Sequence, residues 1–188
     1  MEHQPPTKII GLCGRSRVGK TTSAEILSSL TNYHRNAFAT ILKRTVAIMF
    51  APEGTQTITE ELKPQICPIT NTTYARLLQL VGQGMKSSLG VDVWTKILFQ
   101  KAINPSINKG HGIIIEDIRF PIEAKYIRDA GGIIIKISRQ LAILNDGRNP
   151  KDEDITDTIE ADYEILNNGT IQDLLIQLSS MIRDIGLT

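Results

Sequence analysis

Residues 14–21 read Gly-Arg-Ser-Arg-Val-Gly-Lys-Thr and decide the fold, because they match the spacing G-x-x-x-x-G-K-[ST] at every required position. The apolar run Thr7–Leu12 before them predicts a buried strand, and Lys20–Leu30 after them predicts a helix. A glycine-rich loop between a strand and a helix is the setting in which this spacing binds phosphate. We therefore predict a phosphate-binding loop; the alternative is a glycine turn without a ligand.

Each position of this phosphate loop has a physical role. Gly14 and Gly19 permit backbone angles that turn several N–H groups inward, and the following helix adds positive potential at its N-terminus. Lys20 is expected to reach the β- and γ-phosphates, and the Thr21 hydroxyl to ligate Mg²⁺. The residues predicted to hold a nucleoside triphosphate are Gly14, Arg15, Ser16, Arg17, Val18, Gly19, Lys20, Thr21 and Thr22.

The rest of the chain alternates short apolar runs with helical periodicity. The runs Gly112–Arg119, Ile133–Ser138 and Tyr163–Leu166 predict further strands, and strands this apolar need cover on both faces. The sequence therefore predicts one α/β domain over residues 1–188, a P-loop NTPase three-layer α/β/α sandwich around a mainly parallel sheet. We expect a helical substrate-binding segment over about residues 40–104 and a lid over about 140–158. The helices are predicted at Lys20–Leu30, Phe38–Phe50, Tyr74–Met85, Val91–Leu98, Ile122–Ala130 and after Thr170.

Two stretches carry turn signals instead. Residues 51–71 contain three prolines and a glycine, which predicts mostly loop with at most a short helix. Asn104–Gly110 is polar and predicts turns.

Composition excludes several classes of protein. With 21 basic and 20 acidic residues the net charge is +1, so no overall basic field favours nucleic acid. The apolar runs are too short to cross a membrane, and residues 1–6 lack a secretion signal, so we expect a cytoplasmic protein. Cys13 and Cys67 are expected as reduced thiols, Cys13 packing at the loop entrance rather than reacting.

Five further segments follow the phosphate loop in a characteristic order. They are Phe38–Lys43 (FATILK), Arg76–Gln83 (RLLQLVGQ), Asp92–Trp94 (DVW), Glu116–Ala124 (EDIRFPIEA) and Asn167–Thr170 (NNGT). Together with the loop they resemble the phage-type deoxynucleoside monophosphate kinases over nearly the whole chain. The resemblance implies a P-loop kinase that passes the γ-phosphate of ATP to a deoxynucleoside monophosphate, and it suggests a homodimer.

The sequence departs from that family's pattern at three places. Gln83 stands where the family usually has threonine, and Lys86 where a second arginine is usual. Ile155-Thr156-Asp157 occupies the position of an H-x-S-E segment near the lid, so the histidine is absent and aspartate replaces glutamate. Whether Thr156 and Asp157 replace that motif is left open by the sequence.

Polar residues follow the predicted strand Gly112–Arg119, where ligands bind in parallel sheets. Asp117 can hold Mg²⁺ or orient the acceptor, and the alternative is a cap of the following helix. Arg119 lies two residues on, so in an extended strand it points to the same side, and its planar fork suits an acceptor phosphate. Glu123 either pairs with Arg119 at the surface or orients it.

Lid and acceptor residues are expected in the remaining segments. Arg139 and Arg148 can bring positive charge over the transferring group, with a solvated loop arginine as the alternative for Arg148. Gln79 can read a base edge and shares a helix face with Arg76, a pair that either lines a pocket or is solvated. Trp94 can stack on a base, although its spacing favours core packing. The predicted acceptor-binding residues are Phe38, Lys43, Arg76, Gln79, Trp94, Arg119 and Glu123; the predicted catalytic residues are Lys20, Asp117, Arg119, Arg139 and Arg148.

Three functions remain in competition. The first is phosphorylation of deoxynucleoside monophosphates. The second keeps the fold and changes the acceptor to phosphomevalonate, dephospho-coenzyme A or another small phosphorylated alcohol. The third is an ATPase or nucleotide switch, which requires a water-positioning residue that the sequence does not reveal; the guanine-reading tetrapeptide N-K-x-D is absent.

Overall fold

The computed structural model describes residues 8–140 and 155–187. The chain forms two compact units: the first comprises Met1–Asn36 and Ile103–Thr188, and the second comprises Ala37–Ala102. The predicted helical segment, residues 40–104, overlaps the second unit. Most of the predicted lid, residues 141–154, lies outside the described residues.

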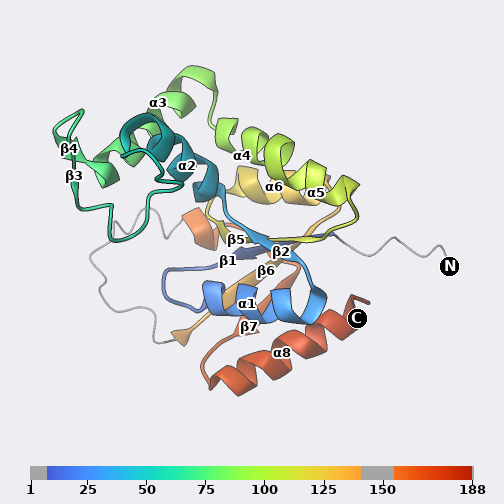
Figure 1. The fold of residues 1–188 in the computed structure, drawn as a ribbon. Coiled ribbons are helices and arrows are strands. Elements are labelled where there is room, and N and C mark those ends of the chain that lie inside the picture. Colours follow the sequence, from blue (N-terminus) through green and yellow to red (C-terminus); the bar gives the residue numbers. More distant parts are fainter. Residues whose placement is uncertain (1–7, 141–154, 188) are drawn as a thin grey trace. The chain divides into compact units, whose positions relative to one another are not determined.

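The first unit is built on a five-stranded sheet (Figure 1). All four strand pairs are parallel. The core strands are almost uninterrupted isoleucine, as expected for a sheet that is covered on both faces. The prediction of a mainly parallel sheet is therefore confirmed. In spatial order the strands are β2 (His34–Asn36), β5 (Ile113–Ile118), β1 (Ile9–Cys13), β6 (Ile133–Ser138) and β7 (Tyr163–Leu166).

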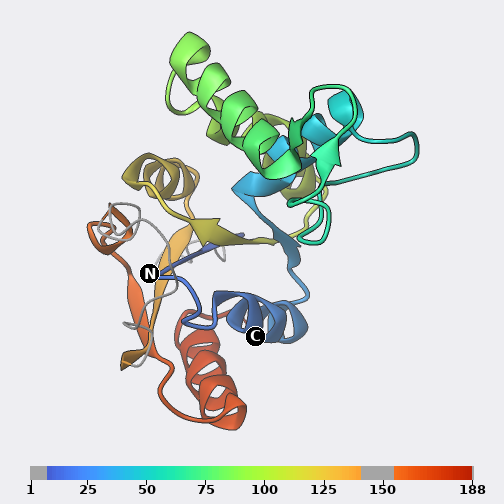
Figure 2. The same cartoon turned by 90° about the vertical axis from the view of Figure 1, so that its left-hand side faces the viewer.

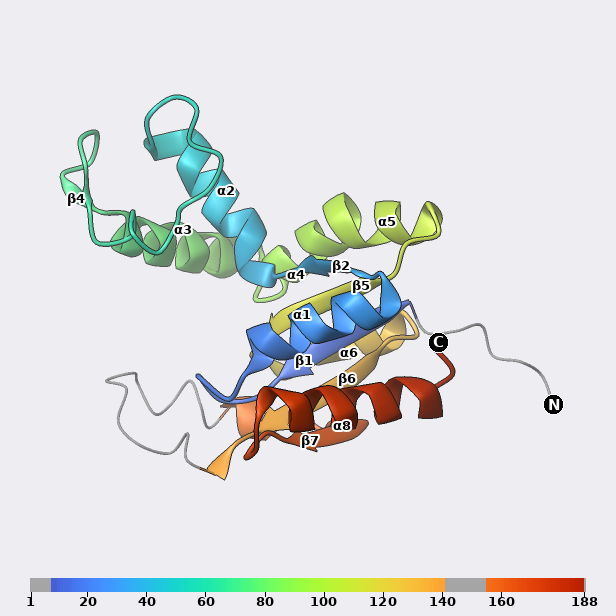
Figure 3. The same cartoon turned by 60° about the horizontal axis from the view of Figure 1, so that its bottom comes forward.

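Helices cover both faces of this sheet, which confirms the three-layer sandwich. Helices α1 (Lys20–Thr31) and α8 (Ile171–Asp184) pack together on one face, where Leu27 and Leu178 are fully buried (Figure 3). Helix α6 (Pro121–Asp129) lies on the other face (Figure 2).

A bulge interrupts β5 near its carboxyl end. Gly11 of β1 pairs with Ile115, but Cys13 pairs with Ile118, so Glu116 and Asp117 together oppose one residue of β1. The bulge changes the face that β5 presents: Ile114 is buried in the core under α1 and α8, whereas the side chain of Ile118 meets α6 around Gly11. Bulges of this kind redirect side chains and are common beside active sites.

The second unit is helical. Its core combines α2 and α3 with the segment between them, through Val46, Ala47, Ile58, Cys67, Tyr74 and Leu77. The elements are α2 (Phe38–Phe50), the hairpin strands β3 (Ile66–Cys67) and β4 (Thr72–Thr73), α3 (Tyr74–Leu89) and α4 (Val93–Leu98). A π-helical turn, η1 (Phe99–Ile103), continues α4 into α5 (Asn104–Asn108) of the first unit.

One prediction of local structure was wrong, and one strand was missed. Residues 104–108 form a helix rather than turns, because Pro105 stands in its first turn, where its missing N–H has no intrahelical partner to lose. The segment 51–71 is mostly loop, as predicted, and it includes the short strand β3. Strand β2 was missed because it is a polar edge strand of three residues, His-Arg-Asn, with no apolar run to reveal it.

Candidate functional site

The phosphate loop has the strand–loop–helix form that the sequence predicts. It leaves β1 at Cys13 and enters α1 at Lys20. Gly14 and Gly19 have positive φ values of 135° and 101°. A Cβ at Gly14 would lie 2.2 Å from the carbonyl oxygen of Ile137, so glycine is required there by space as well as by conformation.

Lys20 lies folded over the loop. Its Nζ donates hydrogen bonds to the carbonyl oxygens of Gly14 at 2.7 Å and Arg15 at 2.6 Å. The N–H groups of the first turn of α1 have no partners within the helix, and together with the helix dipole they attract an anion. Thr21 is an exposed residue of the same turn. The loop and the first turn of α1 therefore combine an ammonium group, helix N–H groups and an exposed hydroxyl residue within one short stretch of chain.

A second group of contacts holds the loop from outside. Arg15 donates from Nη2 and Nε to Oδ2 of Asp157, at 2.5 and 3.1 Å, and Oδ1 of Asp157 lies 3.9 Å from Nζ of Lys136. The amide of Asn167 donates to the carbonyl oxygen of Val18 at 2.8 Å. Asp157 belongs to the segment that departs from the family pattern. Its partner in the phosphate loop is Arg15.

Cys13 is a packing residue, as expected. Its side chain is fully buried, and that burial raises the pKa of its thiol to about 11 despite the nearby charges of Lys136 and Lys20. A thiol that keeps its proton at neutral pH is a poor nucleophile. Cys13 therefore has no part in the chemistry of the loop.

The carboxyl end of β5 differs from the prediction in one respect. Asp117 lies in the bulge and Arg119 lies beyond the last residue of the strand, so simple alternation does not set the relative direction of their side chains. The helix α6 is capped by Glu123, not by Asp117: Oε2 of Glu123 accepts from the backbone N–H groups of Arg119 at 2.8 Å and Phe120 at 3.1 Å.

Glu123 was predicted to bind the acceptor, and its contacts correct that role. Its carboxylate is buried and bonded to the backbone of Arg119, so it fixes where Arg119 stands. The side chain of Arg119 is exposed, as a phosphate-binding group requires. We therefore treat Glu123 as a positioning residue for Arg119.

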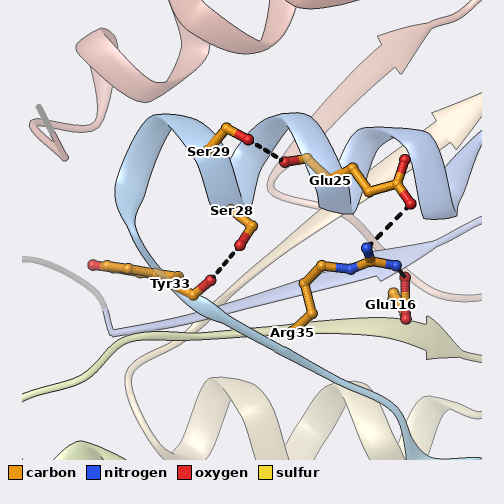
Figure 4. Close-up of polar contacts among 6 residues, drawn as sticks. All are labelled: Glu25, Ser28, Ser29, Tyr33, Arg35 and Glu116. Carbon is orange, nitrogen blue, oxygen red and sulfur yellow. Dashed lines mark hydrogen bonds and ion pairs between the residues drawn. The ribbon is translucent and has the colours of Figure 1, made fainter.

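An arginine that sequence analysis did not find joins the bulge to the phosphate-loop helix (Figure 4). Arg35, on β2, donates from Nη2 to Oε2 of Glu116 at 2.9 Å and from Nη1 to Oε1 of Glu25 at 3.1 Å. Ser28 of the same helix donates to the carbonyl of Tyr33 just before β2, at 2.7 Å. These bonds connect α1, β2 and the residue beside Asp117; Arg35 lies in the missed edge strand, so no motif pointed to it.

The acceptor candidates of the second unit are either at least partly exposed polar residues or a buried aromatic residue. Arg76 and Gln79 are exposed on α3 and bonded to each other, Nη1 to Oε1, at 3.3 Å, which confirms their shared face. Lys43 lies 3.3 Å from Oε1 of Glu60. Trp94 was also predicted to bind the acceptor, but it is 7% exposed and its Nε1 donates to the carbonyl of Gly82 at 3.1 Å, so it belongs to the core.

The remaining predicted residues are an aromatic residue of the second unit and two arginines of the predicted lid. Phe38, the first residue of α2, is 6% exposed. Arg139 is exposed just beyond the end of β6. Arg148 lies outside the described residues.

Thr21 and Asp117 are the residues predicted to hold Mg²⁺. Residues 8–140 and 155–187 contain no cluster of three or more histidine, cysteine, aspartate or glutamate side chains suited to a metal ion. Mg²⁺ in nucleotide sites needs only one or two protein oxygens, since phosphates and water supply the rest. Thr21 is exposed and Asp117 is half-buried.

Comparisons with known proteins show the family of this chain. A model of the deoxynucleotide monophosphate kinase family matches residues 52–178, a range that does not include the phosphate loop. A protein of Acanthamoeba polyphaga mimivirus described as "Putative deoxynucleotide monophosphate kinase" is 27% identical over 194 residues, covering 93% of this chain and 95% of its own. In the part of the chain that the structure describes, no helix is long and apolar enough to cross a membrane.

Solved structures show the same fold. TT1252 from Thermus thermophilus has a TM-score of 0.57 at 14% identity, covering 96% of this chain and 98% of its own. Dephospho-CoA kinase from Campylobacter jejuni has a TM-score of 0.53 at 17% identity, covering 95% and 97%. Shikimate kinase from Aquifex aeolicus has a TM-score of 0.50 at 14% identity, covering 95% and 99%. Identities this low establish the fold alone.

Proposed function

The chain belongs to the deoxynucleotide monophosphate kinase family and has the fold of P-loop kinases, and from this premise we propose that it transfers the γ-phosphoryl group of ATP to a deoxynucleoside monophosphate. The observation that carries the proposal is the phosphate loop with Lys20 folded over its carbonyls. The loop and the family match are independent, because the matched residues begin at 52.

The donor side consists of the phosphate loop and α1. Backbone N–H groups and the helix N-terminus bind the phosphates of ATP, and Lys20 moves from the two carbonyls to the β- and γ-phosphates. Thr21 and Asp117 would hold Mg²⁺, which neutralises charge on the phosphates when it is bound. Phosphoryl transfer needs such charge stabilisation and alignment more than it needs a covalent intermediate.

In the transfer itself, a phosphate oxygen of the acceptor forms a bond to the γ-phosphorus. The bond between that phosphorus and the β,γ-bridging oxygen breaks, and the electron pair leaves with ADP. Arg119 is proposed to bind the acceptor phosphate, in the position that Glu123 fixes, and Arg139 to stabilise charge on the transferring group. Arg148 keeps the same proposed role.

The base and phosphate of the acceptor are proposed to meet polar side chains of the second unit. Arg76 and Gln79 form one exposed polar pair, and Gln79 has an amide able to read a base edge. Lys43 supplies a further positive charge, which is paired with Glu60. By the family resemblance we also propose a homodimer, which sedimentation would test.

ADP release from ATP and Mg²⁺ tests the function. Parallel reactions contain each deoxynucleoside monophosphate, each ribonucleotide, phosphomevalonate, dephospho-coenzyme A or no acceptor. We expect release that depends on one or more deoxynucleotides and is lost in Lys20→Ala and Arg119→Ala. Release without any acceptor would instead indicate an ATPase, and release with only a non-nucleotide acceptor would overturn the proposed substrate.

A further inference from the structure

Three neighbouring strands end around the phosphate loop. In the sheet β6 lies between β1 and β7, so the loop after β1, Arg139 after β6 and Asn167 after β7 share one edge. We propose that Asn167 and its neighbour Asn168 are positioning residues that fix the phosphate loop relative to Arg139. The inference rests on the proposed function, in which the loop and Arg139 act on the same phosphoryl group.

Asn167 holds the end of the loop that enters α1. Its Nδ2 donates to the carbonyl oxygen of Val18 at 2.8 Å, and the side chain is 8% exposed. A Cβ at Gly19 would lie 2.4 Å from that same nitrogen, so the amide packs directly against the loop. A buried hydrogen bond in such close contact sets the position of the loop backbone, whose N–H groups must face the phosphates.

The same two asparagines hold the backbone on both sides of Arg139. The backbone N–H of Asn167 donates to the carbonyl of Ser138 at 2.8 Å. The backbone N–H of Gln140 donates to Oδ1 of Asn168 at 2.9 Å. The backbone of Arg139 is therefore held on both sides, at Ser138 by the backbone of Asn167 and at Gln140 by the side chain of Asn168. The adjacent turn is itself fixed, because Thr170 and Asp173 form a capping box at the start of α8.

The two asparagines use different atoms of their side-chain amides: Asn167 donates through its nitrogen and Asn168 accepts through its oxygen. Val18 offers a carbonyl, which only accepts, so Asn167 must donate from nitrogen. Gln140 offers a backbone N–H, which only donates, so Asn168 must accept through oxygen. Replacing asparagine by aspartate keeps the shape and replaces the nitrogen donor by an oxygen. The identical substitution therefore breaks the bond at 167 and preserves it at 168.

The first experiment measures ATP binding by calorimetry without an acceptor, in the full chain. We expect Asn167→Asp to weaken binding about tenfold or more, the effect of losing one ordinary hydrogen bond and gaining a repulsive contact with a carbonyl. Asn168→Asp is the matched control and should stay within about twofold of the parent. Asn167→Ala removes the donor without adding charge, and it gives the same reading should the aspartate variant fail to fold.

The second experiment tests the link to Arg139 through turnover. Asn168→Ala should lower kcat about tenfold with an unchanged Kd for ATP, and Asn168→Asp should restore kcat. On an Arg139→Ala background, Asn168→Ala should cause no additional loss of kcat, because no arginine side chain is then left for Asn168 to position. A merely stabilising role would lower the melting temperature and leave this non-additivity absent.

Several results would overturn the proposal. They are an unchanged Kd for ATP in both Asn167 variants, equal weakening by aspartate at 167 and 168, or losses from Asn168→Ala and Arg139→Ala that multiply. Lys20→Ala separates this inference from the proposed function. If that variant also binds ATP normally, the nucleotide site itself is wrong; if only the acceptor assays fail, the binding arm with Asn167 still stands or falls on its own.

Discussion

The two units of this molecule differ in how firmly their candidate phosphate-binding groups are held in place. In the first unit, the phosphate loop is fixed by two crowded glycines and by Asn167. In the second unit, the basic side chain of Lys43 is partly exposed and that of Arg76 is exposed, and they contact the surface side chains of Glu60 and Gln79. A site bonded to backbone is preorganised, whereas a site of exposed long side chains must be ordered by its ligand at an entropic cost.

The difference matches what each unit is proposed to bind. A triphosphate chain is the same in every donor molecule, so a rigid backbone cradle suits it. An acceptor differs in its base, and side chains can change that preference without disturbing the fold. We infer that donor binding in this protein is built into the fold and acceptor choice is carried by replaceable side chains.

The largest expected effect comes from the two lysines. Lys20→Ala should lower kcat by about a hundred- to a thousandfold, the effect of removing one preorganised charge from the transition state. Lys43→Ala should change kcat/KM for the acceptor by about tenfold or less, because Glu60 and solvent already screen that charge. Steady-state kinetics with varied ATP and varied acceptor measure both, and equal losses would abolish the contrast between the units.

Two glycines with positive φ give the next effect. Gly14→Ala should reduce the free energy of unfolding by about 3 kcal/mol or more, since its Cβ would meet the backbone oxygen of Ile137 at 2.2 Å and backbone cannot move aside cheaply. Gly54→Ala in the second unit has φ 88° but nothing within 4 Å, so only conformational strain of about 1 kcal/mol is expected. Denaturant unfolding of both variants would refute the argument if the order were reversed.

The two arginines proposed for the acceptor follow. Arg119→Ala should raise the KM for the acceptor about tenfold or more and leave the Kd for ATP unchanged, because it removes a charge-assisted bond to the acceptor phosphate. Arg76→Ala should raise the same KM by a smaller factor, about threefold, since the exposed side chain must be ordered by the ligand. A larger effect on ATP than on the acceptor in either variant would reassign that arginine to the donor side.

The smallest expected effect concerns pH. Burial raises the pKa of Cys13 to about 11, whereas in the unfolded chain the thiol titrates near 9.0. The contribution to stability is therefore complete below about pH 9 and is lost as pH rises toward about 11, because only the unfolded state then releases the proton. Unfolding at pH 8 to 11 should show a smaller decline in Cys13→Ala than in the parent, and Cys67→Ala, which retains Cys13, should keep the full decline.

The sequence predicted those parts of the fold that depend on residues close together in the chain. The loop spacing and the isoleucine runs led to the right strands and to the helix after the loop, because each is a pattern within a few residues. Long-range contacts left no such trace. Arg35 between Glu25 and Glu116, and Asp157 on Arg15, join residues far apart in the chain, so only the fold brings them together.

Burial decides between alternatives that the sequence left open. Trp94 and Glu123 have side chains that suit a base or a phosphate, but their partners are the carbonyl of Gly82 and the backbone of Arg119, in line with core packing for Trp94 and with orientation of Arg119 by Glu123. The bulge in β5 was hidden because strand alternation is assumed when register is unknown. Residue type therefore predicted which chemistry is present, and the register and burial decided where it acts.

Lys20 acts as an intramolecular competitor in its own site. Before any nucleotide arrives, its ammonium already has two short hydrogen bonds to carbonyls of the loop. An incoming anion must replace both of them, which a lone phosphate does poorly and a chelating polyphosphate does well, because several oxygens bind at once. In the proposed nucleotide site, the folded lysine is therefore expected to favour a polyphosphate over inorganic phosphate.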